Sequence, residues 1–323
     1  MSTIEMIRAA QARLSGHIRA TPILSSPFLD EIAGRRVLIK AECLQHTGSF
    51  KFRGGYSALS GITDAQRAGG VIAYSSGNHA QGVALAAKLH GVTAVIIMPA
   101  DAPKQKIENT RAFGAEVVLY NRFNEDRDAL GQWLADERGL TLIRPFDEPL
   151  VIAGQGTLGL ELGPQLSAHG MTLGDVLVCC GGGGLTSGTA LALADVAPGL
   201  RVRTVEPAGF DDVARSLLSD KIESNAPDAR SICDAIVTPS PGTVTFPIMK
   251  TLCGPGLSVS DDECLRAMAL AFQRLKIVGE PGGVVALAAA LFHAREIEGE
   301  SVAVVLTGGN VDSDVFARAL AML

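Results

Sequence analysis

The sequence lacks the marks of several protein classes. Its six cysteines include no CxxC pair, which argues against a disulfide framework or a zinc cluster. No apolar run approaches the ~20 residues of a membrane span, and the N-terminal residues carry spread charges in place of the apolar stretch of a signal peptide. A formal net charge of -6 argues against nucleic acid or an anionic membrane as the main partner. We therefore expect a cytoplasmic protein with reduced thiols.

What the chain has in plenty is apolar residues with regular spacing. Hydrophobic residues make up 47% of the 323 residues, which excludes a disordered protein. Short runs rich in valine and isoleucine predict buried strands over 71–74, 94–98, 116–119, 175–180, 202–205 and 302–306. Helical spacing of apolar residues predicts helices over 81–90, 104–113 and 123–137. Strands that alternate with helices predict parallel sheets and an α/β fold.

The alternation of strands and helices also suggests two domains. Residues 70–147 form a strand–helix unit by themselves, and the alternation resumes after Ile152. We predict a small domain over 70–147 that is inserted into a larger one made of 1–69 and 148–323. Pro145 and Pro149 mark the predicted return of the chain to the larger domain.

Four consecutive glycines, Gly181, Gly182, Gly183 and Gly184, follow a predicted strand directly. Without Cβ atoms they can turn successive N–H groups toward one anion, and the start of the next helix adds positive charge. The spacing fits neither a dinucleotide turn nor a P-loop, which requires lysine shortly after the glycines. The pattern predicts a phosphate-binding turn. The alternative is a flexible turn without a ligand.

Lys51 stands between two aromatic residues, Phe50 and Phe52. An amine kept among apolar groups has a lowered pKa, because desolvation disfavours its charged form. Such a lysine can form a Schiff base with a carbonyl group. The alternative is a lysine that reaches solvent from a helix surface.

Two further turns carry polar groups at the ends of predicted strands. The first is SSGNH, over 75–79, and the second is TGGN, over 307–310. Ligands of α/β proteins bind outside the carboxyl ends of parallel strands, where both turns are expected. The alternatives are simple helix capping by Ser76 or Asn78 and an ordinary tight turn.

Five segments in order, SFKFRGG, SSGNHAQG, AGQGT, CGGGGL and TGGN, carry a resemblance to a known family. They resemble the serine/threonine dehydratase and serine racemase family of pyridoxal-phosphate enzymes, of the tryptophan-synthase-β fold type. The resemblance extends from Thr21 to Asn310. It implies two parallel-sheet α/β domains, the smaller inserted into the larger, with pyridoxal 5'-phosphate in the cleft between them.

The resemblance also implies a cofactor site. Lys51 would join the cofactor through a Schiff base, and the four glycines would hold its phosphate. The other residues that would surround the ring are Phe50 on one face, Ala235 on the other, Asn78 at the 3'-oxygen, Thr307 at the ring nitrogen, and Glu280 nearby. For Glu280, a core-capping role is the alternative.

For the substrate, the resemblance implies an amino acid bound at the small domain. Ser75, Asn78 and His79 would take its carboxylate at a helix start, and Arg127 would face it. The alternative for Arg127 is a solvated surface position. Lys51 would remove the Cα proton, and Ser76 could serve as a second acid or base on the opposite face.

A segment with Glu206, Phe210 and Asp212 resembles one that binds Mg²⁺ or Ca²⁺ in some members of the family. Two carboxylates and the carbonyl of Phe210 would suit such a hard cation. The alternative is an acidic cluster that is favourable at a helix N-terminus.

The implied activity is β-elimination from a hydroxy amino acid such as L-threonine or L-serine, which gives a 2-oxo acid and ammonia. The alternatives are serine racemase activity, 3-hydroxyaspartate ammonia-lyase activity, β-replacement and a non-catalytic regulatory module. The intact Lys51 argues against the last of these, the non-catalytic module. The residues 238–245 are expected to line the pocket for the β-substituent. The sequence ends soon after TGGN, so we expect no regulatory domain and a catabolic role. The family also implies a homodimer.

Overall fold

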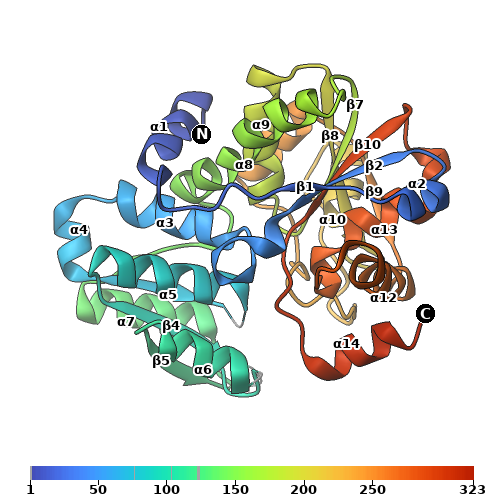
Figure 1. Cartoon of the computed structure of the whole chain (residues 1–323). Helices are drawn as coiled ribbons and strands as arrows, with labels where there is room; N and C mark the ends of the chain where they lie inside the picture. The colour runs from blue at the N-terminus through green and yellow to red at the C-terminus, as the bar shows by residue number, and fades with distance from the viewer. Residues whose placement is uncertain (1, 76, 103, 122–123) are drawn as a thin grey trace.

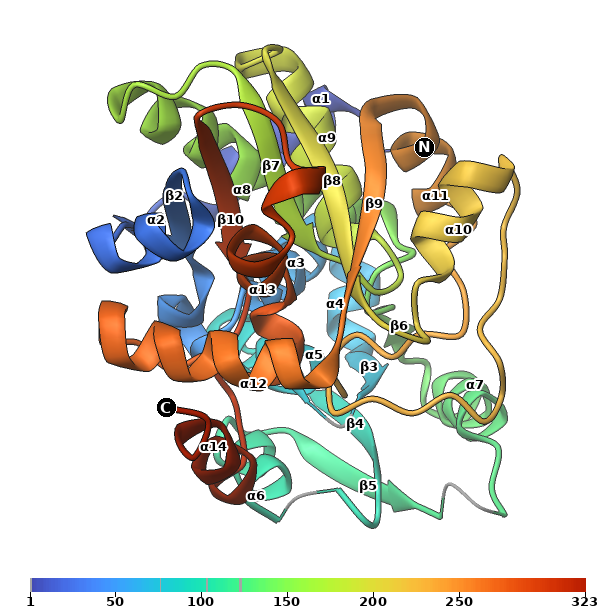
Figure 2. The same cartoon turned by 90° about the vertical axis from the view of Figure 1, so that its right-hand side faces the viewer.

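The fold is described from a computed structural model, which describes residues 2–75, 77–102, 104–121 and 124–323. It contains two β-sheets, each flanked by helices, and the smaller unit lies beside the larger (Figure 1, Figure 2). The predicted α/β class with two domains is confirmed. Within the described ranges, no helix is both long and apolar enough to span a bilayer.

The larger sheet has six strands in the order β1-β2-β10-β7-β8-β9. Their bounds are β1 Ile23–Leu24, β2 Arg36–Ala41, β7 Gly174–Cys179, β8 Leu200–Pro207, β9 Cys253–Val259 and β10 Ser301–Leu306. Every neighbouring pair is parallel except β1 and β2, which are antiparallel. The expected all-parallel sheet is therefore mixed at this edge.

The smaller sheet has four strands in the order β5-β4-β3-β6, and all its pairs are parallel. Their bounds are β3 Val71–Tyr74, β4 Ala94–Pro99, β5 Glu116–Tyr120 and β6 Thr141–Leu142. All four lie within the range 70–147 that the sequence assigned to the small domain.

Helices cover the faces of both sheets. The α-helices of the described residues are α1 Ile4–Leu14, α2 Pro27–Ala33, α3 Lys51–Gly61, α4 Asp64–Gly69, α5 Asn78–His90, α6 Lys104–Ala112, α7 Arg127–Arg138, α8 Pro149–Ala168, α9 Gly184–Val196, α10 Asp212–Ser219, α11 Thr245–Leu252, α12 Asp261–Leu270, α13 Val285–Phe292 and α14 Ser313–Leu320. The three predicted helices correspond to α5, α6 and α7. The expected start of α7 at 123 falls outside the described residues.

Helix α3 joins the two units. It packs against α5 of the smaller unit and against α8 of the larger one. A Cβ atom on Gly55 would lie 2.9 Å from the carbonyl oxygen of Gly82 in α5. A Cβ atom on Gly154 in α8 would lie 2.5 Å from the carbonyl oxygen of Arg53. Such close approach requires glycine. Because α3 precedes residue 70 and yet contacts both units, the domain borders remain a prediction.

A buried group of charges fixes α3 just beyond Lys51. The guanidinium of Arg53, which is fully buried, donates to both carboxylate oxygens of Glu42 at 2.8 and 2.7 Å and to Glu161 at 2.9 Å. Lys40 of β2 also pairs with Glu161. Each buried charge therefore has an opposite partner, which offsets its desolvation. The network ties β2, α3 and α8 together around the helix that begins with Lys51.

Candidate active site

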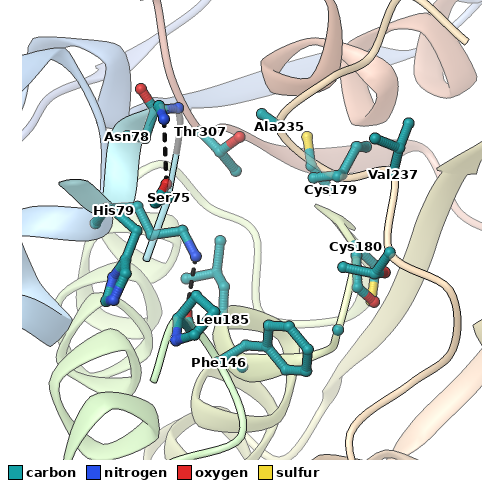
Figure 3. A pocket seen from close by; sticks show the side chains of 18 of the residues that line it. Ser75, Asn78, His79, Phe146, Cys179, Cys180, Leu185, Ala235, Val237 and Thr307 are labelled. Atoms are coloured by element: carbon teal, nitrogen blue, oxygen red, sulfur yellow. Dashed lines mark hydrogen bonds between the residues drawn. The ribbon is translucent and has the colours of Figure 1, made fainter. Parts of the chain in front are cut away.

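A cavity of about 430 Å³ opens between the two sheets, beyond the carboxyl ends of their strands (Figure 3). The segments that line it come from both units: 50–51, 74–75, 77–79, 144–147, 179–186 and 234–239, with single residues that include Lys106, Arg127, Gln155, Glu280 and Thr307. Parallel strands end at a common edge, so turns that are distant in sequence meet there. The structure therefore brings together the lysine, the glycine turn and both polar turns.

Lys51 is the first residue of α3 and lies inside this cavity. Its Nζ donates a hydrogen bond of 2.8 Å to the carbonyl oxygen of Pro145 and lies 5.2 Å from the centre of the Phe50 ring. Burial lowers the pKa of Lys51 to about 8, although the negative charge of Glu280 opposes this. The amine is thus far more often neutral near pH 7 than an exposed lysine is, as a nucleophile requires.

The four glycines form the turn between β7 and α9 at the floor of the cavity. Gly183 has φ +90°, in the left-handed region that favours glycine. A Cβ atom on Gly182 would lie 2.2 Å from the ring of Phe146. The turn exposes backbone N–H groups at the start of α9, an arrangement that suits a phosphate.

Glu280 and Asn78 form a hydrogen-bonded pair that links the two units. The Asn78 side chain donates to Glu280 Oε1 at 2.6 Å and accepts a bond of 2.7 Å from Asn310. Burial raises the pKa of Glu280 to about 7. One N–H of Asn78 is left for a ligand, because an amide nitrogen carries two.

The turn that contains Thr307 lies next to Lys51. The backbone N–H of Phe50 donates to the carbonyl oxygen of Thr307 at 3.1 Å, and Ser49 pairs with Gly308 in an isolated bridge. Thr307 and Ala235 both line the cavity. All the predicted cofactor-binding residues therefore meet in one place.

Three of the predicted substrate residues, Ser75, Asn78 and His79, lie at or just before the start of α5 (Figure 3). The Ser75 hydroxyl accepts a bond of 3.1 Å from Gly77. The ring Nε2 of His79 lies 3.0 Å from the carbonyl oxygen of Ile143, so Nε2 must carry a proton. Burial, with the charge of Lys51, lowers the pKa of His79 to about 3. Its neutral ring then has only an acceptor left, so His79 can bind an anion through its backbone N–H alone. Ser76 lies outside the described residues.

Cationic side chains occupy the outer part of the cavity. Arg127 lies with its guanidinium carbon 4.5 Å from the centre of the Tyr74 ring, and it lines the cavity as Arg144 does. Both arginines are exposed. Lys106 of α6, by contrast, is buried and forms an ion pair with Asp234.

Sequence reasoning missed several residues of the cavity, among them Gln155, Phe146 and Lys106. Gln155, in the AGQGT segment, is 1% exposed and has both amide atoms without a hydrogen-bond partner. Phe146 packs on the glycine turn, and Lys106 reaches the cavity from α6. The AGQGT segment carries the resemblance, but its local sequence indicates no role for Gln155. Nothing in the local sequence distinguishes Phe146 or Lys106 from ordinary residues.

The predicted metal ligands lie away from this cavity, between β8 and α10. Glu206 accepts bonds from the backbone N–H groups of Val213 at 2.9 Å and Ala214 at 2.7 Å. Burial and the charge of Asp212 raise the pKa of Glu206 well above its ordinary value, and burial raises that of Asp212 to about 6. Asp212 Oδ2 is buried without a partner. An orphaned carboxylate oxygen beside a second buried acid fits a cation, although the described residues hold no group of three acidic, histidine or cysteine side chains.

Comparison with known proteins places this chain in a family. The model of the pyridoxal-phosphate dependent enzymes matches residues 14–308. The chain belongs to this family, and the resemblance inferred from the sequence is confirmed. The buried lysine, the glycine turn and the polar side chains of Asn78 and Thr307 in the cavity fit such a cofactor.

The relatives narrow the group of enzymes further. The chain is 45% identical over 316 residues to L-threo-3-hydroxyaspartate ammonia-lyase from Pseudomonas sp, covering 98% of this chain and 97% of the other. It is 38% identical over 320 residues to serine racemase from Schizosaccharomyces pombe, with coverage of 99% and 98%. A crystal structure of a T.th. threonine deaminase superimposes with a TM-score of 0.90 at 43% identity, covering 96% of this chain and 99% of the other. The protein is thus an enzyme of the pyridoxal-phosphate ammonia-lyase and racemase group.

Proposed function

We propose that the enzyme catalyses β-elimination from a hydroxy amino acid, which yields a 2-oxo acid and ammonia. One observation carries the proposal: a buried lysine with a lowered pKa lies in the cavity that also holds the glycine turn. The bound cofactor would supply an aldehyde that condenses with amines and a ring that withdraws electrons from the attached carbon. A regulatory module without catalysis would not need the Lys51 amine.

The chain's own residues have distinct tasks in this proposal. Gly181–Gly184 hold the phosphate through backbone N–H groups, while Asn78 and Thr307 orient the ring. Lys51, once its amine is free, takes the proton from Cα of the substrate, since it lies in the cavity on the rigid start of α3. The carbonyl oxygen of Pro145, at 2.8 Å, can accept a hydrogen bond from this amine and direct it.

The substrate carboxylate is proposed to bind at the start of α5. Ser75, Gly77, Asn78 and His79 line the cavity there, and the positive end of the helix favours an anion. The Ser75 hydroxyl and the backbone N–H of His79 contribute donors, whereas the His79 ring stays neutral and bonded to Ile143. The elimination removes one proton from Cα and adds one proton to the leaving hydroxyl, so it neither gains nor loses a net proton.

Among hydroxy amino acids, we favour 3-hydroxyaspartate over L-threonine and L-serine. The exposed guanidinium groups of Arg127 and Arg144 line the cavity beyond the predicted site of the first carboxylate. A second carboxylate gains from such cations, while a methyl group or hydrogen does not. The name of the Pseudomonas relative supports the same choice.

The test is a panel of hydroxy amino acids assayed for 2-oxo acid and ammonia. We expect L-threo-3-hydroxyaspartate to have the highest kcat/KM, with slower turnover of threonine and serine. Elimination without any preference for the dicarboxylate would reject the choice of substrate alone. No 2-oxo acid from any member of the panel would reject the elimination itself.

Racemisation is the second candidate, and the similarity to serine racemase supports it. It requires a second acid or base on the face opposite Lys51, the role the sequence suggests for Ser76. Chiral chromatography of unreacted serine separates the two activities. A Ser76→Ala variant that lost only racemisation would identify the second group.

Two further features belong to the proposal. Glu206, the carbonyl of Phe210 and Asp212 would bind Mg²⁺ or Ca²⁺, which would stabilise the fold and take no part in the chemistry.

A homodimer is supported by exposed apolar side chains at one edge of the larger unit, where Phe28 is 56% and Phe272 is 42% exposed. Light scattering after gel filtration measures the mass. A monomer at micromolar concentration would reject the dimer.

A further inference from the structure

An ion pair crosses between the two units at the rim of the cavity. Lys106 Nζ of α6 lies 3.3 Å from Asp234 Oδ2, on the stretch between α10 and α11 that runs toward the smaller sheet (Figure 2). Both residues line the cavity. Of the ion pairs formed between described residues, it alone joins the range 70–147 to the rest of the chain.

The Asp234 end of the pair belongs to a wall that is fixed in the larger unit. This wall consists of Asp234, Ala235 and Ile236. Ile236 packs so closely on the glycine turn that a Cβ atom on Gly181 would lie 3.1 Å from its Cα. Asp261 of α12 accepts bonds from two residues shortly before this wall, Ser231 at 2.6 Å and Ile232 at 3.1 Å. A displacement of this wall would therefore disturb the glycine turn.

The Lys106 end belongs to the smaller unit, which carries the predicted carboxylate site at the start of α5. Helix α6 packs against α5. The distance between Lys106 and Asp234 is thus linked to the width of the cavity between α5 and the Ala235 wall. The substrate's β-carbon would lie in this part of the cavity if its carboxylate lies at α5.

The two partners differ in how much they depend on each other. The Lys106 side chain is 10% exposed, whereas that of Asp234 is 60% exposed. Burial disfavours the charge of Lys106, and the carboxylates of Asp234, Glu280 and Asp312 more than compensate, so that its pKa is raised. Loss of Asp234 would leave a largely buried cation with a weaker partner, while loss of Lys106 leaves an acid that water can solvate.

We propose that Lys106 is a positioning residue which, through its pair with Asp234, holds the smaller unit at the spacing that binds the substrate. Without the pair, a smaller fraction of the enzyme molecules has the arrangement that binds substrate. The apparent affinity for substrate falls in proportion to this fraction. Lys51 makes its hydrogen bond to Pro145 and not to this pair, so kcat should change much less than KM.

A double-mutant cycle with Lys106→Gln, Asp234→Asn and the double variant tests the proposal. Each single change is expected to raise KM about fivefold, the effect of ~1 kcal/mol at such a pair, with kcat within about twofold of wild type. Asp234→Asn should have the larger effect, and the double variant should be no worse than that single change. Lys104→Gln, at an exposed lysine of the same helix, is the control and should leave KM unchanged. The proposal would be overturned if the rise in KM of the double variant equalled the product of the rises in the two single variants. It would also be overturned if KM were unchanged in both single variants.

A second readout does not need activity. Hydrogen exchange of the protein without cofactor or substrate should be faster over α6 in Lys106→Gln than in wild type, and unchanged in Lys104→Gln. Equal exchange in Lys106→Gln and wild type would also overturn the proposal. The KM arm rests on the proposed function. If no hydroxy amino acid is turned over, that function fails, and hydrogen exchange alone decides the role of Lys106.

Discussion

The two walls of the cavity are built in different ways. The wall of the larger unit holds Lys51, the glycine turn and Glu280, all packed so closely that an added Cβ atom at Gly182 or Gly308 would lie within about 2.2 Å of a neighbour. The wall of the smaller unit holds a fixed helix start but also Arg127, whose side chain is exposed. Close packing permits little variation, while exposed side chains can change at small cost.

This difference suggests a division of labour. The large-unit wall would fix the chemistry that the whole group of enzymes shares, and the small-unit wall would choose the substrate. Relatives that are named as ammonia-lyases and as racemases share 38–45% identity with this chain over nearly its whole length. Variants on the large-unit wall should therefore weaken cofactor binding or chemistry, and variants on the other wall should change selectivity.

The largest effect is expected at Lys51. Lys51→Ala should lower turnover by about 10⁴-fold, because no other amine of the described residues lies on that wall to take the Cα proton. The measurement is 2-oxo acid release with 3-hydroxyaspartate, together with a thermal melt to show that the variant folds. Borohydride reduction of the wild-type enzyme with its cofactor should label Lys51 in peptide maps. A label on another lysine would place the chemistry elsewhere.

The lowered pKa of Lys51 gives the next largest effect. Only a neutral amine attacks the cofactor aldehyde, and burial lowers the pKa of Lys51 from 10.5 to about 8. The rate of cofactor attachment to the apoenzyme should therefore rise about a hundredfold from pH 6 to pH 9 and level off above pH 8. Stopped-flow absorbance follows the reaction. A rate that still rises tenfold per pH unit at pH 9 would show an ordinary exposed lysine.

The strands show what the sequence could and could not reveal. Runs of valine and isoleucine correctly predicted β3, β4, β5, β7, β8 and β10 to within a few residues. Strand β2 was missed because it contains the charged Lys40, whose partner Glu161 lies far along the chain. Strand β9 was missed because it contains Gly-Pro-Gly, which local rules assign to turns. Partners distant in sequence override these local preferences.

The same limit applies to the site. Lys51, the glycines and Thr307 could be found because each has a local pattern with a chemical meaning. These residues then meet because the parallel strands of the sheets end at a common edge. The bond between Asn78 and Glu280 and the pair of Lys106 with Asp234 join residues more than a hundred positions apart, and no local pattern announces them.

The glycine turn offers a smaller effect on the large-unit wall. Gly182→Ala would place a methyl group 2.2 Å from the Phe146 ring, and overpacking of this kind costs at least ~1.4 kcal/mol, or tenfold in cofactor affinity. Fluorescence titration of the apoenzyme with pyridoxal phosphate measures the change. The matched control is Gly131→Ala in α7, where the added atom would meet only ordinary contacts at 3.4 Å. Equal losses in both variants would contradict the contrast between the walls.

On the small-unit wall, Arg127→Gln should change selectivity alone. We expect KM for 3-hydroxyaspartate to rise about fivefold, since an exposed ion pair contributes up to ~1 kcal/mol, while KM for threonine stays constant. Arg138→Gln is the control, because Arg138 lies on the same helix but pairs with Glu116 away from the cavity. A rise in KM for both substrates would remove Arg127 from the recognition of a second carboxylate.

The smallest effect is expected outside both walls, at Glu206 and Asp212. A cation bound there should change the stability of the fold without changing the chemistry. A cation at these two buried carboxylates would relieve the cost of their charges and give the unpartnered Asp212 Oδ2 a ligand. Binding to the folded state alone stabilises it, so saturating Mg²⁺ or Ca²⁺ should raise Tm by about 3 °C or more over EDTA. Asp212→Asn should abolish this rise, and Asp211→Asn, at the neighbouring residue that pairs with Arg215, should keep it. An identical melting curve with EDTA and with either ion would leave Glu206 as a helix cap, held by its bonds to Val213 and Ala214.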